Sequence, residues 1–131
     1  VRAEQFDGII HLGDGQSDAK WLEKETGVQV QFVAGNCDLC RDCPRELRQT
    51  MDGVRLLAVH GDKYNVKLEL TTLSYYAEEA CAQAALFGHT HQPFAGYVGR
   101  VLLVNPGSLA QGRYAELRLD HGQAVPFLKE F

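Results

Sequence analysis

The stretch from which the fold is inferred first is residues 8–14, Gly-Ile-Ile-His-Leu-Gly-Asp. A short apolar run ends there at a glycine that is followed by a carboxylate. An apolar run of this length between turn residues is typical of a buried strand. Similar runs over 28–34, 54–59 and 84–87 also end at polar residues. In open α/β sheets, ligands bind at the carboxyl ends of the strands. The pattern therefore predicts a ligand site built from Asp14, Asn36, His60 and His89.

Helices and hairpins are predicted around these strands. Ser17 is a suitable cap for a helix through Thr26, and Gly27 would end it. Apolar residues recur every three or four positions over 66–80, as on one face of a helix. Residues 1–7 resemble the end of another helix. Hairpins are expected over 47–60, around Asp52-Gly53, over 94–104 and over 113–131. The expected fold class is α/β, a β-sandwich of two packed sheets flanked by helices.

Composition narrows the class of protein. The chain has 131 residues, 45% of them hydrophobic and 23% charged, which excludes a disordered or fibrous protein and predicts a single domain over residues 1–131. No apolar run approaches the ~20 residues of a membrane helix. The net charge of -4 argues against nucleic-acid binding. Four cysteines without a secretory signal favour a cytoplasmic protein with thiols rather than a disulfide framework.

The polar residues form a plausible set of metal ligands. A carboxylate, an amide oxygen and imidazoles suit Mn, Fe, Ni or Zn better than Ca. Glycines before Asp14, Asn36 and His89 allow sharp turns. His91 lies two positions after His89, so in an extended backbone both would point the same way and serve neighbouring ions. Taken singly, a Gly-Asp pair is most often a turn and a buried histidine is usually part of the core, but the ordered set favours a metal site.

Five motifs together give the chain a family resemblance. Its His-Leu-Gly-Asp, Gly-Asn-Cys-Asp, His-Gly-Asp, Gly-His-Thr-His-Gln-Pro and Asn-Pro-Gly-Ser motifs resemble those of the calcineurin-like metallophosphoesterases, in particular the small bacterial and archaeal phosphodiesterases. That branch also includes the phosphoesterase-like scaffold subunit of the retromer coat. The motifs begin at residues 11, 35, 60, 88 and 105.

The resemblance implies a two-metal site at one sheet edge. Asp14 would bridge both ions, Asn36, His60 and His89 would complete the shell of one, and His91 would reach the other. Mn is the first expectation for the metal, with Zn, Ni or Fe as alternatives, and two ions are expected in a complete protein.

Three departures from the family pattern stand out. The family opens with a strand carrying Asp-x-His, which has no counterpart here, so the chain is expected to lack its first strand and two of seven ligands. Asp62 stands where many relatives have a second histidine. Cys37 stands where many larger relatives have a histidine that acts as general acid, and a thiol is a poor substitute.

The expected function is metal-dependent hydrolysis of a small phosphate ester, a phosphodiester by preference, with no catalytic side chain assigned besides the metal ligands. The alternative is a catalytically silent interaction protein with the same fold. An uncovered sheet edge would also favour a homo-oligomer.

Other candidates receive a structural interpretation. Cys37, Cys40 and Cys43 have the spacing of part of an iron–sulfur or zinc site, but a fourth ligand is missing, and oxidation of Cys40 and Cys43 stays open. His11 is expected to be structural, and His121 to be solvated in a hairpin turn. The stretch from Asn105 to Ser108 is predicted to be a turn, although by the resemblance it could line the pocket.

Overall fold

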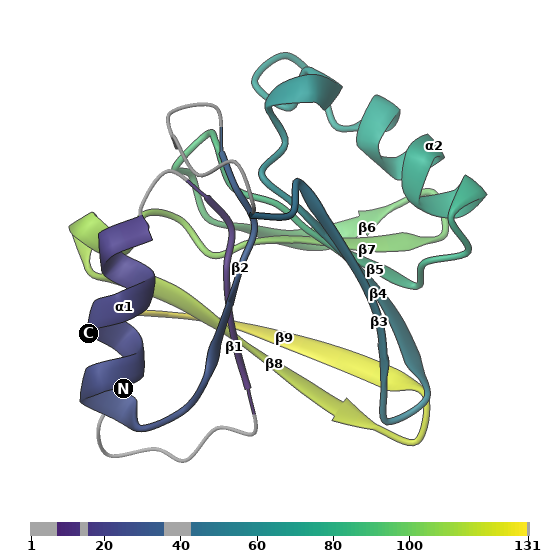
Figure 1. Ribbon diagram of the computed structural model, residues 1–131. Helices are drawn as coiled ribbons and strands as arrows, with labels where there is room; N and C mark the ends of the chain where they lie inside the picture. Colours follow the sequence, from purple (N-terminus) through teal and green to yellow (C-terminus); the bar gives the residue numbers. More distant parts are fainter. Residues whose placement is uncertain (1–7, 14–15, 36–42, 131) are drawn as a thin grey trace.

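The structure is a computed structural model that describes residues 8–13, 16–35 and 43–130 (Figure 1). Its elements in chain order are β1 (Ile9–His11), α1 (Gln16–Thr26), β2 (Val30–Phe32), β3 (Glu46–Met51), β4 (Val54–Val59), the 3-10 helix η1 (Asp62–Tyr64), α2 (Thr71–Glu79), β5 (Ala84–Leu86), β6 (Phe94–Val98), β7 (Val101–Asn105), the 3-10 helix η2 (Leu109–Gln111), β8 (Arg113–Asp120) and β9 (Gln123–Glu130).

The strands form one large sheet and two small ones. The five-stranded sheet has the order β3-β4-β5-β7-β6, with β5 parallel to both β4 and β7 and antiparallel hairpins at each edge. The parallel pair β1–β2 and the antiparallel pair β8–β9 lie on one side of it, and α2 covers the other side (Figure 1). The predicted α/β class with flanking helices is confirmed, and the large sheet is mixed. Among the described strands, however, the second layer is two separate pairs rather than one sheet.

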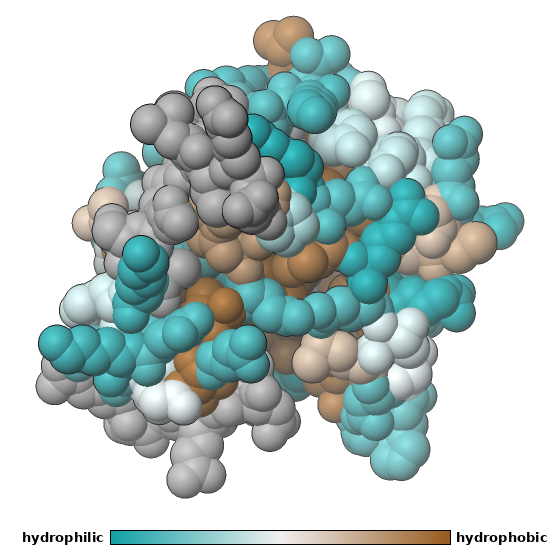
Figure 2. Space-filling model, viewed as in Figure 1, coloured by the Kyte–Doolittle hydropathy of each residue, from teal (hydrophilic) through white to brown (hydrophobic). Residues whose placement is uncertain are grey.

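Strand β4 has both faces buried. Leu56 and Ala58 point into an inner cluster shared with the two small sheets, whereas Leu57 and Val59 point into an outer cluster shared with α2. Side chains alternate across a strand, so a run of apolar residues fits only where both faces are covered. A third, smaller cluster joins α1 to the β1–β2 pair. Figure 2 shows apolar side chains reaching the surface near the middle of the displayed face, among mostly hydrophilic neighbours.

The predicted hairpins are confirmed. Asp52 and Gly53 connect β3 to β4 with φ of 48° and 80°. A two-residue turn with positive φ at both positions matches the twist of the flanking strands. The turn between β8 and β9 packs against this one, and Gly122 N donates to Asp52 O at 2.9 Å.

Both helix predictions need correction at their starts. The helix expected over 66–80 is α2, which begins only at Thr71. Asn65, left-handed with φ of 53°, starts a turn instead, in which the backbone N–H groups of Leu68 and Glu69 donate to Asn65 O. The Glu69 carboxylate then accepts hydrogen bonds from the backbone N–H groups of Thr71 and Thr72, at 2.7 and 3.2 Å, and so caps the first turn. Helix α1 begins at Gln16, so Ser17 lies inside it rather than at its cap.

Cys43 departs from the expectation of free thiols and agrees with the oxidation that stayed open for it. Cys43 is disulfide-bonded, whereas Cys81 carries an exposed, free thiol. Cys37 and Cys40 lie outside the described residues, as do residues 1–7 with their predicted helix end. Among the described residues, no helix has the length and apolar character needed to span a membrane.

Candidate metal centre

His60 follows β4 and is buried, with 2% of its surface exposed. Its Nδ1 lies 2.7 Å from the backbone oxygen of Leu12. A carbonyl oxygen only accepts, so Nδ1 is the donor of this hydrogen bond, and Nε2 points to the other side of the ring. Histidine ligands of metals are oriented in this way, by donating from the other ring nitrogen to a backbone carbonyl. The structure therefore presents His60 Nε2 as an oriented donor atom.

His89 meets this atom from the end of the neighbouring strand β5. Its Nδ1 lies 3.1 Å from His60 Nε2, and the two rings meet edge to face with centroids 4.9 Å apart. Two nitrogens bonded to one ion at about 2.1 Å lie about 3 Å apart when the bonds are close to perpendicular. At this distance the two nitrogens share a hydrogen bond, and imidazole nitrogens at this spacing also suit two ligands of one transition-metal ion. Two of the predicted ligands are brought together.

A glycine allows the end of β1 to approach this pair. Gly13 has φ of 104°, and a Cβ placed on it would lie 2.6 Å from His60 Nδ1 and 2.8 Å from Gly35 N. Only a residue without a side chain fits such a backbone at such close range. Gly13, after β1, therefore lies against both His60 and Gly35, the residue that precedes the predicted ligand Asn36.

Asn105 holds the segment that carries the predicted histidine ligands. It is fully buried at the end of β7. Its Nδ2 donates to Gly88 O at 3.2 Å and to Thr90 Oγ1 at 2.9 Å, and its Oδ1 accepts from Gly107 N at 2.9 Å. Interpreting this residue as part of a turn missed the larger role of its amide. The available signal was an amide placed directly after a fully apolar strand.

The backbone at His89 and His91 differs from the expectation. Both have left-handed φ, 67° and 60°, so the segment is not extended and the alternation argument does not apply. Such conformations cost about 1 kcal/mol or more in residues other than glycine and persist where the surroundings impose them. His91 is exposed. Asn105, bonded on either side of His89, provides the restraint.

The full ligand set is not visible in the described part of the chain. Within residues 8–13, 16–35 and 43–130, no three histidine, cysteine, aspartate or glutamate side chains form a group that could hold a metal ion. Asp14 and Asn36 lie outside the described residues. The His60–His89 pair is thus the part of the predicted centre that the structure places.

Two further histidines behave as expected. His11 Nδ1 accepts from Gly13 N at 3.2 Å, and its ring stacks on Phe32 with centroids 5.4 Å apart, which is a structural role. His121 lies in the β8–β9 turn, exposed and paired with Asp120.

Comparison with known proteins identifies the family. The model of the calcineurin-like phosphoesterase superfamily domain matches residues 1–119. The chain belongs to this superfamily. Membership implies the use of divalent metal ions and a phosphoesterase ancestry, in agreement with the paired histidines.

Individual relatives agree with this assignment. The chain is 32% identical over 127 residues to a Bacillus subtilis protein described as "Probable metallophosphoesterase YsnB", covering 92% of this chain and 73% of that protein. A predicted phosphoesterase from Streptococcus pneumoniae superposes with a TM-score of 0.79 at 26% identity, covering 96% of this chain and 75% of that one.

Two more distant structures share the fold alone. Vps29 from Entamoeba histolytica superposes with a TM-score of 0.79 at 14% identity, over 99% of this chain and 85% of that one. An archaeal phosphodiesterase has a TM-score of 0.70 at 18% identity, over 97% of this chain and 86% of that one.

Proposed function

We propose that this protein hydrolyses phosphate esters, phosphodiesters by preference, at a dinuclear metal centre. The observation that carries the proposal is the pair of facing ring nitrogens of His60 and His89, 3.1 Å apart, in a chain of the calcineurin-like phosphoesterase superfamily. Asp14 and Asn36 would join this pair around one ion, and His91 with Asp14 would hold the second. The mixed oxygen and nitrogen donors favour Mn, with Zn, Ni or Fe as alternatives.

The residues of this chain hold and orient the ligands. His60 donates from Nδ1 to Leu12 O, which orients the ring so that Nε2 would be the metal-binding nitrogen. Asn105 fixes the backbone on both sides of His89. Bound divalent ions would supply positive charge to the phosphoryl oxygens and lower the pKa of a coordinated water.

The reaction consumes one water for each ester. The water oxygen forms a bond to phosphorus, and the bond from phosphorus to the leaving oxygen breaks. One proton of the water passes to the leaving alcohol, and the other is retained by the phosphate monoester or released to solvent. Because Cys37 replaces the general-acid histidine of larger relatives, this transfer would fall to solvent, which favours leaving groups of low pKa. The archaeal phosphodiesterase of the same fold is consistent with a diester substrate.

The second candidate function is a catalytically silent interaction protein. The superposition with Vps29, at a TM-score of 0.79 over 99% of this chain, favours it. The two functions differ in a measurable way, since a scaffold would keep its fold and stability when the histidine pair is removed and would show no turnover beforehand.

Metal content and turnover test the proposal together. The purified protein is loaded with Mn, Zn, Ni or Fe, and hydrolysis of bis(4-nitrophenyl) phosphate is followed. His60→Ala and His89→Ala should each lose bound metal and at least about a hundredfold in kcat/KM, as expected when a ligand that stabilises transition-state charge is lost. His121→Ala is the matched control, because that histidine is exposed in the β8–β9 turn. Absence of metal binding and of turnover in the wild type with all four metals would refute the proposal.

A further inference from the structure

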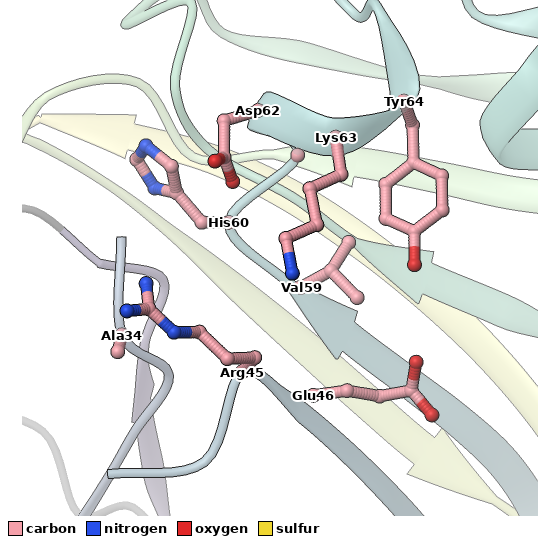
Figure 3. Close-up of a pocket in the computed structure, with 9 residues that line it drawn as sticks. Ala34, Arg45, Glu46, Val59, His60, Asp62, Lys63 and Tyr64 are labelled. Atoms are coloured by element: carbon pink, nitrogen blue, oxygen red, sulfur yellow. The ribbon is translucent and has the colours of Figure 1, made fainter. Parts of the chain in front are cut away.

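A cavity of about 120 Å³ opens beside His60, on the side of β4 that faces η1 and the start of β3 (Figure 3). Arg45, Asp62, Lys63 and Tyr64 line it together with His60. A space of this size holds several water molecules or one small anionic group. Since His60 belongs both to this wall and to the histidine pair, the cavity adjoins the candidate metal centre.

Two cationic side chains in this wall have hydrogen-bond donors that no described residue uses. Within the described part of the chain, the Lys63 ammonium has no ion-pair partner and no hydrogen bond. Arg45 Nη1 donates to Gly35 O at 2.9 Å, which uses one of the five donors of the guanidinium group. Figure 3 shows Lys63 reaching from η1 toward Val59 and Arg45 extending from the position just before β3. Unpaired cations therefore gather here although the chain carries a net charge of -4.

The carboxylates in the wall do not neutralise both cations. Glu46 also lines the cavity, but its Oε2 pairs with Arg48 Nε at 2.6 Å and its Oε1 accepts from the Tyr76 hydroxyl. Asp62 is the other acidic residue of the lining, beside His60 (Figure 3). Two cations against one available carboxylate leave a positive charge in the cavity. An anionic ligand would find charge-assisted hydrogen bonds there.

Tyr64 also lines this wall, and its hydroxyl is hydrogen-bonded to Tyr76. Burial and the neighbouring Tyr76 hydroxyl raise the pKa of Tyr64 to about 12, so its hydroxyl stays protonated at neutral pH. The ring is held by contact with the Tyr76 ring, with centroids 5.0 Å apart.

We infer that this cavity is a substrate subsite, in which Lys63 and Arg45 bind a second anionic group of the ester, a phosphate or a carboxylate next to the phosphoryl group that is hydrolysed. This inference rests on the proposed function and names its substrate class. A phosphoryl group at the His60–His89 pair would place its neighbouring substituent at the mouth of this cavity. Diesters with a negative charge beyond that of the phosphodiester group should therefore be preferred over diesters of the same shape without it.

Three synthetic diesters test the preference. They are 4-nitrophenyl phenyl phosphate and its derivatives with a carboxylate or a phosphate on the phenyl ring, each assayed with the metal-loaded protein. The carboxylate and phosphate derivatives should have KM values about tenfold lower than the parent diester, with kcat changed less than about threefold. Comparison of the two derivatives shows whether a carboxylate or a phosphate is the better ligand.

Variants assign the preference to the cavity. Lys63→Met should remove most of the tenfold preference and leave turnover of the diester without the extra charge unchanged within about twofold. Lys67→Met is the matched control, because that lysine is exposed and does not line the cavity. It should retain the full preference. Equal loss in Lys67→Met and Lys63→Met would mean that general surface charge causes the effect, and would overturn the assignment.

Binding without turnover separates this inference from the proposed function. Phenylphosphonate and 3-carboxyphenylphosphonate, which are not hydrolysed, are titrated into the wild type and Lys63→Met by calorimetry. If no diester is hydrolysed but the carboxylated probe binds about tenfold more tightly in a Lys63-dependent way, the proposed function fails and the subsite stands. If diesters are hydrolysed but neither preference is seen, the subsite is refuted and the proposed function stands.

Discussion

The five-stranded sheet and the layer opposite it differ in how completely their strands are paired and buried. In the sheet, β4, β5 and β7 have strand partners on both sides and lie between two apolar clusters. The opposite layer consists of the pairs β1–β2 and β8–β9, which are not hydrogen-bonded to each other in the described part of the chain. Half-buried Ile10, Leu117 and Leu119 from these pairs pack on the inner cluster. The stability of the molecule should therefore be unevenly divided between the two layers.

The largest expected effect concerns this division. Leu57→Ala removes a fully buried side chain between β4 and α2 and should lower the free energy of unfolding by about 3 kcal/mol. Leu119→Ala, the same change on half-buried β8, should lower it by about 1 kcal/mol, since less surface is re-exposed and no closed cavity is left. Denaturant unfolding of both variants makes the comparison. Equal losses would show that the two layers are packed equally well.

A smaller effect tests how the large sheet supports the metal centre. Asn105→Asp keeps the shape of the side chain but replaces the amide donor to Gly88 O and Thr90 Oγ1 with an acceptor. An unpaired buried group of this kind costs about 1–3 kcal/mol. We expect unfolding to become easier by about 2 kcal/mol and metal affinity to fall about tenfold.

The control for this change is Asn65→Asp, at an exposed position outside the centre. If Asn105→Asp loses stability while metal affinity stays unchanged, Asn105 supports only the fold and does not position His89.

The smallest effect concerns the helix that covers the large sheet. Hydrogen bonds from Thr72 and Thr71 hold the pKa of the Glu69 carboxyl below its ordinary value of 4.5. The charged form is therefore favoured in the folded state. Its contribution is present above pH 4.5 and is lost as the pH falls toward the lowered pKa of the folded state.

Glu69→Gln should accordingly lower the melting temperature slightly at pH 7 and have less effect near pH 3. Glu79→Gln, on the last turn of the same helix, is the control. A difference between wild type and Glu69→Gln that grows as the pH falls would contradict the capping role.

Sequence patterns predicted the turns and strand ends, which depend mainly on residues close together in the chain. The β3–β4 hairpin followed from Asp52 and Gly53, because that dipeptide has few other conformations. The meeting of His60 and His89 followed from the rule that parallel strands end at one edge. The role of Asn105 was not predicted, because its bonds to Gly88 O and Thr90 Oγ1 depend on how the segment after β5 turns, which strand patterns do not specify. The start of α2 was missed because the carboxylate of Glu69 and the left-handed Asn65 override an apolar spacing that continues upstream.

The contact between the β3–β4 and β8–β9 turns, here called the clasp, joins the two layers at the end of the sandwich away from the histidines. Gly53 and Gly122 allow it, since a Cβ on Gly53 would lie 3.1 Å from Gly122 N. It closes a loop of about seventy residues between the two layers. Strand β4 runs from this clasp to His60, a span of about 20 Å for six residues. At the other end of β4, His60 donates to the backbone oxygen of Leu12, so the two layers are joined by a hydrogen bond at each end of this one strand.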